Sequence, residues 1–124
     1  MKSYTDLEQS KKLAEILPLE SADMYYPYNV GGIFCYHKRT PRVRQVNNHF
    51  ALFYNDIPCW SLSALMNILE KEKVEICFTC SGNKYWVDVH FETWGCFCQD
   101  HELYDSKIDA LIAMIKKLKS RNLL

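Results

Sequence analysis

The sequence predicts an α+β fold, an antiparallel sheet of four to five strands with three helices in the order α-β-β-α-β-β-(β)-α. Two observations predict it. Apolar residues recur at helical spacing near the start, in the middle and at the end of the chain. Between these stretches lie short segments in which apolar and polar residues alternate, and the clearest two are joined by a tight turn. Strands joined by such a turn run antiparallel.

The length and composition predict one globular domain, residues 1–124, with a core of ordinary size. The 15 basic and 15 acidic residues leave no net charge, which argues against a dedicated nucleic-acid binder. The N-terminal stretch lacks the apolar region of a signal peptide, and no run reaches the roughly 18 apolar residues of a membrane span. We therefore expect a cytoplasmic protein without membrane contact.

The first helix is predicted over residues 5–17. Thr5 and Glu8 have the spacing of a capping box, which satisfies the free amides at a helix start. Leu13 and Leu17 fall near one face, and Pro18 ends the helical pattern. Two strands are predicted next, over residues 32–38 and 49–56. The segment between them carries Arg39, Arg42 and Arg44 and is expected to be an exposed basic connection.

The second helix is predicted over residues 58–73, with Ser61 as its N-cap. Its apolar stripe at i, i+3, i+4 and i+7 consists of Leu62, Leu65, Met66 and Leu69.

Residues 74–80 and 84–92 alternate as two strands of a hairpin, with residues 81–83 as its turn. Residues 96–99 are a candidate for a short last strand. The third helix is expected to begin near Asp105 or Ser106, with an apolar stripe of Ile108, Leu111, Ile112, Ile115 and Leu118. Basic residues gather at its C-terminal end, where the helix dipole favours cations.

Three stretches of the chain resemble a known group of proteins. They are "SADMYY" (Ser21–Tyr26), "PCWSLSALMNIL" (Pro58–Leu69) and "IDALIAMIKKL" (Ile108–Leu118). The chain resembles small proteins without an assigned function from gut anaerobic bacteria and their phages and mobile elements. A P-x-W-S-L-x-x-L helix and a D-A-x-x-x-M-I-x-x-L terminal helix recur in that group. The resemblance implies a single-domain α+β fold, and it implies that the paired cysteines belong to this chain rather than to the group.

The chain has six cysteines, which in the cytoplasm are expected to be free thiols, with metal ligation as the alternative. Cys77 and Cys80 form a C-x-x-C pair that could supply half of a zinc site, and Cys98 with His101 could supply the other half, with Cys96 as a substitute. A regular strand would instead place Cys77 and Cys80 on opposite faces, because side chains alternate. We therefore favour an ordinary hairpin and expect no cofactor, with zinc as the alternative.

The sequence leans against an enzyme, because no nucleophile–base pair or carboxylate pair stands out. Asp88, His90 and Glu92 share one face of a predicted strand, for which a solvated polar face is the simpler explanation.

The favoured hypothesis is a non-enzymatic interaction module of bacterial or mobile-element origin. Its partner would be an unidentified protein or a second copy of the chain. The alternative is a small zinc-stabilised domain that binds nucleic acid through its arginines. Aromatic and arginine side chains are enriched at protein interfaces. The candidate partner-binding residues are Tyr25, Tyr26, Tyr28, Trp86, Arg39, Arg42 and Arg44.

Overall fold

The computed structural model describes residues 2–30, 33–34, 40–44, 55–72, 74–91, 95–98 and 102–124. These residues divide into two compact units. Tyr4–Ala64 form one unit, and Leu65–Leu124 together with Met1–Ser3 form the other. Each unit is described by itself below, and the expectation of a single domain stays a prediction.

The Tyr4–Ala64 unit contains one complete helix and several short strands. Its elements are α1 (Leu7–Ala14), the 3-10 turn η1 (Leu19–Ser21), β1 (Met24–Tyr26), β2 (Asn29–Val30), β3 (Ile33–Phe34), β4 (Arg42–Val43) and β5 (Ile57–Cys59). β1 is the middle strand of an antiparallel sheet in the order β4-β1-β5, and β2 pairs with β3. Helix α2 (Leu62–Glu70) starts at the end of this unit.

Helix α1 begins one residue later than the capping box proposed from the sequence. Asp6 is the N-cap: its side chain accepts from the amide of Gln9, and the Gln9 side chain accepts from the amide of Asp6. Thr5 and Glu8 therefore do not form the cap. Thr5 is fully buried, and its hydroxyl contacts groups far along the chain. The sequence pattern could not distinguish the Thr5–Glu8 pair from the Asp6–Gln9 pair, because both have the i, i+3 spacing of a capping box.

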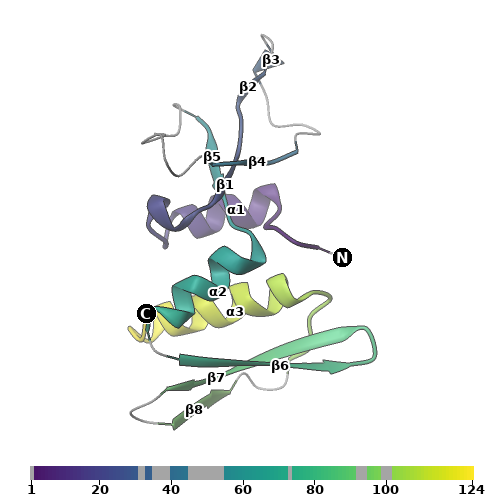
Figure 1. Ribbon diagram of the computed structural model, residues 1–124, viewed down its shortest axis with the longest axis vertical. Helices are drawn as coiled ribbons and strands as arrows, with labels where there is room; N and C mark the ends of the chain where they lie inside the picture. Colours follow the sequence, from purple (N-terminus) through teal and green to yellow (C-terminus); the bar gives the residue numbers. More distant parts are fainter. Residues whose placement is uncertain are drawn as a thin grey trace. The chain divides into compact units, whose positions relative to one another are not determined.

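The other unit contains most of α2, a three-stranded antiparallel sheet and a long helix (Figure 1). Its strands are β6 (Val74–Ser81), β7 (Lys84–Phe91) and β8 (Gly95–Cys98), in the order β6-β7-β8, and its long helix is α3 (Lys107–Ser120). Gly82 in the two-residue turn between β6 and β7 has φ of 63°, a backbone conformation that favours glycine. The predicted hairpin is confirmed, with Ser81 inside the strand rather than in the turn.

Helix α3 covers one face of this sheet, against β7 (Figure 1). Val87 and Val89 of β7 are fully buried. The predicted stripe of α3 is buried as expected: Ile108, Leu111, Ile112, Ile115 and Leu118. Ser106 is the N-cap, accepting from the amide of Asp109, so the helix starts where the sequence predicted.

The α+β class with three helices and antiparallel strands is confirmed. The described strands form three small sheets, whereas the sequence predicted one sheet of four or five strands. Pro58 lies upstream of the Ser61 cap, as the sequence predicts, and it belongs to the strand β5, opposite Tyr25, which the sequence did not predict. Proline has no amide hydrogen to donate, so β5 suits the edge of a sheet and cannot easily extend it.

The predicted strand over residues 49–56 lies mostly outside the described residues, as does most of the strand predicted over residues 32–38, of which Ile33 and Phe34 form β3. The N-cap of the second helix is confirmed, because the Ser61 hydroxyl accepts from the amide of Ala64 at 3.1 Å. In the part of the chain that the structure describes, no helix is long and apolar enough to cross a membrane.

Candidate functional site

A buried polar cluster organises the Tyr4–Ala64 unit. The Thr5 hydroxyl accepts from the backbone amide of Trp60 at 3.1 Å and lies 2.7 Å from the Ser10 hydroxyl. The Cys59 thiol lies 3.4 Å from both the hydroxyl and the carbonyl oxygen of Thr5. Burial raises the pKa of that thiol, because the thiolate would lose its hydration. The polar groups of this cluster are satisfied within the fold, which indicates a structural role.

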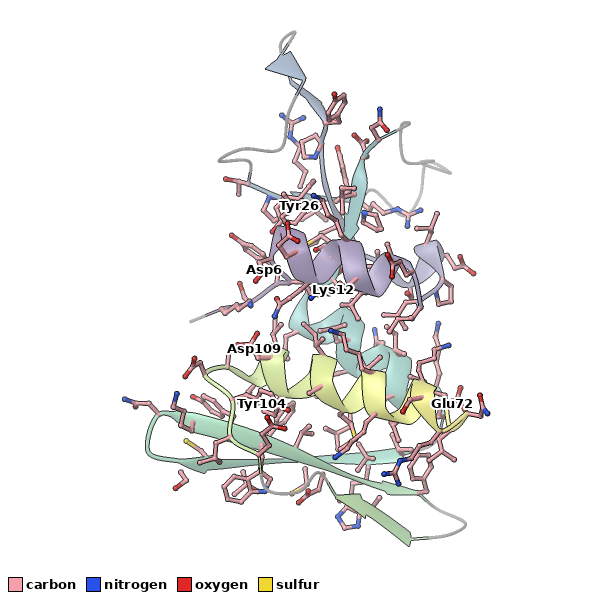
Figure 2. The ribbon with its side chains drawn as sticks, turned by 180° about the vertical axis from the view of Figure 1, so that it is seen from behind. Asp6, Lys12, Tyr26, Glu72, Tyr104 and Asp109 are labelled. Carbon is pink, nitrogen blue, oxygen red and sulfur yellow. The ribbon has the colours of Figure 1, made fainter. Side chains whose placement is uncertain are left out.

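Tyr26 belongs to this cluster and not to a partner surface. Its side chain is 5% exposed, and its hydroxyl donates to the carbonyl of Thr5 at 2.8 Å. Figure 2 shows Tyr26 beside the first turns of α1. Burial raises the pKa of the phenol above its ordinary value. The sequence-based assignment of Tyr26 to partner binding is therefore corrected: the alternation along β1 turns it inward.

A carboxylate joins the central strand of this unit to the start of α2. Asp23 accepts from the amide of Ser61 at 2.9 Å with one oxygen, and from the Ser61 hydroxyl with the other. The indole of Trp60 donates to the Ser21 hydroxyl at 3.0 Å. These contacts hold the chain from η1 to β1 against the entry to α2.

The exposed surface of the same unit carries two large apolar side chains. Val43 in β4 is 72% exposed, and Leu19 in η1 is 50% exposed. Arg44 connects the two segments: its guanidinium donates to the carbonyls of Leu19 and Ala22 at 2.8 and 3.2 Å, and its amide donates to the carbonyl of Asp23. We call Leu19, Tyr25, Arg42 and Val43 the Val43 surface.

The predicted binding residues of this unit have different roles. Arg42 is exposed and pairs across the sheet with half-buried Tyr25. Because side chains alternate along a strand, these two residues lie on the opposite face of the edge strand β4 from Val43, and the Val43 surface therefore includes both faces of this edge. Arg44 anchors the strand through its contacts with η1. Tyr28 is half-buried, and its amide donates to Asp56. Arg39 lies outside the described residues.

The sheet of the other unit has a face opposite the one that carries Val87 and Val89. Side chains alternate along a strand, so this second face collects the remaining residues of each strand. We call it the polar face. It carries Glu75, Cys77, Thr79 and Ser81 from β6, and Lys84, Trp86, Asp88 and His90 from β7. Trp86, expected at a partner surface, is half-buried there.

The structure does not bring Cys77 and Cys80 together as a metal-binding pair. Cys77 pairs with Asp88 on the polar face, whereas Cys80 pairs with Tyr85 on the other face. The Cys80 thiol donates to the carbonyl of Gly82 at 3.1 Å. Both thiols are exposed and free. The regular β6 strand therefore separates the two sulfurs, as its period of two requires.

The second half of the alternative zinc site, Cys98 and His101 with Cys96 as a substitute, is only partly described. His101 lies outside the described residues, and Cys96 and Cys98 are described by their backbone. The strand register pairs Cys98 with Asp88 and Cys96 with His90. Among the described side chains, no group of three or more His, Cys, Asp or Glu residues is arranged to hold a metal ion.

The sequence predicts that Asp88 lies on a solvated polar strand face and does not assign it to binding. Its Oδ1 atom is buried and has no hydrogen-bond partner. A buried carboxylate oxygen is costly unless a cation or a donor reaches it. Leu19 and Val43 were also missed, since a single apolar residue in a loop or a two-residue strand leaves no periodic signal.

The chain matches no protein-family model, no curated protein and no solved structure.

Proposed function

We propose that this protein is a non-enzymatic interaction module that binds a protein partner through the Val43 surface. The observation that carries the proposal is the 72% exposure of Val43 on a strand. Single exposed apolar residues are common, but here a second one, Leu19, lies in a segment tied directly to that strand by Arg44. Covering these side chains with a partner would remove apolar area from water.

The backbone that carries this surface is already held in place. Arg44 makes three hydrogen bonds to the segment from Leu19 to Asp23, so β4 and η1 are fixed to one another before any partner arrives. A surface that is ordered in advance loses less conformational entropy on binding. This favours a binding role over an incidental exposure of two aliphatic side chains.

The chemistry of the Val43 surface suits a partner that offers both an apolar group and a carboxylate. Arg42 is exposed beside Tyr25, and these residue types are enriched among those that dominate binding energy. The guanidinium can make paired hydrogen bonds to a carboxylate, while the aliphatic side chains accept an apolar residue. The partner is an acidic–apolar protein segment, or a second copy of the chain with such a segment.

We also propose that the protein acts in the cytoplasm of a bacterium and is encoded by the host or by a phage or mobile element. Free thiols support this location: Cys59, Cys77 and Cys80 are all unpaired, as expected in a reducing compartment. The sequence resemblance described above is the support for the origin.

Photo-crosslinking in native cells tests the binding surface. A benzophenone amino acid replaces Val43 in one variant and Lys12, an exposed residue of α1 labelled in Figure 2, in the other. We expect a discrete crosslinked species from position 43 and none from position 12. Adding Arg42→Glu should remove the species, because the charge reversal repels a carboxylate.

The mass of the species identifies the partner: twice the mass of the chain indicates self-association. If position 43 gives no crosslink, or the same species forms from both positions, the proposal is wrong. Circular dichroism of each variant confirms that the fold is retained.

A further inference from the structure

The polar face carries several residues of the types that commonly bind transition metals, namely cysteine, histidine, aspartate and glutamate. Two rows run across the three strands in register: Cys77, Asp88 and Cys98 form one row, and Glu75, His90 and Cys96 form the next. Positions that pair directly in an antiparallel ladder share a face of the sheet. All six positions carry thiol, imidazole or carboxylate groups, which are the ligands of zinc.

Asp88 occupies the centre of the first row and has an unsatisfied acceptor. Its Oδ1 atom is buried without a hydrogen-bond partner. Buried carboxylate oxygens are normally paired or coordinate a metal. This orphaned atom, independent of the register, points to a cation at the row that contains Asp88.

Strand spacing excludes a site that uses both Cys77 and Cys98. Cys77 and Cys98 lie two strands apart, about 10 Å between their backbones. Two sulfurs on one zinc ion are at most about 4.6 Å apart, because each Zn–S bond is about 2.3 Å long. A cysteine side chain, with one C–S bond, is too short to close that gap from both sides.

The β6–β7 half of the face is the weaker candidate. Glu75, Cys77, Asp88 and His90 are all described, and no three of them are arranged to hold a metal ion. The remaining block joins β7 to β8: Asp88 with Cys98, and His90 with Cys96. Its paired positions are about 5 Å apart across the strands. Its successive positions are about 7 Å apart along each strand.

We infer that this block of Asp88, His90, Cys96 and Cys98 is a zinc-binding site. Zinc accepts thiolate, imidazole and carboxylate ligands together. Binding replaces the protons of the two thiols, which leave to solvent, and the imidazole binds in its neutral form. The site differs from the C-x-x-C arrangement that the sequence offered as an alternative, since it uses neither Cys77 nor Cys80. It is independent of the Val43 surface, which belongs to the other unit.

Cobalt titration of the full-length, reduced, metal-free protein tests the inference. Co²⁺ is the probe because thiolate ligation gives a charge-transfer band in the near ultraviolet, and tetrahedral ligation gives intense visible bands. We expect one equivalent of Co²⁺ to bind and one equivalent of Zn²⁺ to displace it. Each of four substitutions should weaken Co²⁺ binding: Cys96→Ser, Cys98→Ser, Asp88→Asn and His90→Gln. The loss of affinity should exceed about 10- to 100-fold, which is the effect of losing a residue that contacts only a metal ligand and not the metal itself.

Cys77→Ser and Cys80→Ser are the matched controls, because both residues are exposed thiols of the neighbouring strand β6. Both variants should bind Co²⁺ as the wild type does. The inference is overturned if the folded wild type shows no charge-transfer band, or if Cys77→Ser or Cys80→Ser abolishes it. If Cys96→Ser or Cys98→Ser does not fold, the two β7 variants still test the inference. Unchanged Co²⁺ binding by both Asp88→Asn and His90→Gln would contradict the site.

Discussion

The two units of this protein are stabilised in different ways. In the Tyr4–Ala64 unit the strands are two or three residues long, and side-chain hydrogen bonds join residues 38 to 55 positions apart in the chain. In the other unit, two eight-residue strands pair along their full length, and one face of a 14-residue helix is buried. Long periodic elements therefore organise one unit, while a few polar side chains organise the other.

The largest expected effect comes from truncating the centre of the first unit. Trp60 is fully buried and its indole donates to Ser21. Trp60→Ala should lower the free energy of unfolding by about 3–5 kcal/mol, since it leaves a cavity and removes the indole donor to Ser21. Urea unfolding measures the change. Trp86→Ala on the polar face is the control and should cost about 1 kcal/mol. Equal losses in the two variants would contradict the central role of Trp60.

Removing one hydroxyl tests whether polar contacts hold the first unit. Thr5→Val keeps the shape of the side chain but leaves the buried amide of Trp60 without its acceptor. We expect a loss of about 1–3 kcal/mol in the free energy of unfolding. Thr79→Val, at a half-buried position of β6, should stay within about 0.5 kcal/mol of wild type. If Thr5→Val is as stable as wild type, the hydrogen bonds of the cluster do not stabilise the unit, and only its packing does.

Helix caps allow a direct comparison of the units. Ser61 and Ser106 each accept from a helix amide at 3.1 Å. Either change to Ala should cost about 0.5–2 kcal/mol. Ser61→Ala should cost more, because Ser61 also donates to Asp23. Chemical denaturation measures these losses in the free energy of unfolding. When Asp23 is already changed to Ala, Ser61→Ala should lower the free energy of unfolding only as much as Ser106→Ala does. An unchanged difference would show that Asp23 is not the cause.

Alkaline pH should destabilise the first unit through Cys59. Burial raises the pKa of this thiol above its ordinary value of 9.0, so the folded protein keeps the proton when the unfolded chain has lost it. Stability is full below pH 9 and falls as the pH rises toward the folded-state pKa. Thermal melts across this range should fall more steeply for wild type than for Cys59→Ala. Burial also raises the pKa of Tyr26, so the melting temperature of Cys59→Ala should still fall with rising pH, but less steeply than that of wild type.

The smallest effect is expected from an ion pair in the second unit. Lys2 contacts Asp109 in the first turn of α3 at 2.9 Å, and Figure 2 shows Asp109 at that turn. Both side chains are partly exposed, so Lys2→Ala should lower the free energy of unfolding by at most about 1 kcal/mol. The difference should shrink in high salt. A loss that salt does not change would indicate packing of the lysine stem instead.

The elements that the sequence predicted well are those with a long period. The α3 stripe, its start at Ser106 and the hairpin of β6 and β7 match the structure because many residues repeat the same signal. The cap of α1 was misplaced by one residue, since Thr5 and Asp6 both fit a local pattern. The separation of Cys77 from Cys80 was foreseen from strand alternation, and the register confirms it.

The α+β class, the three helices and the faces of the long elements can be predicted from the sequence, because they follow from periods of 3.6 and 2 along the chain. Three further features depend on tertiary structure: Tyr26 turns inward, Arg44 joins β4 to η1, and Asp88 lies between Cys77 and Cys98 in the strand register. These facts depend on which strands pair and in which register. Pairing brings together residues that are distant in the chain, and no local period encodes it.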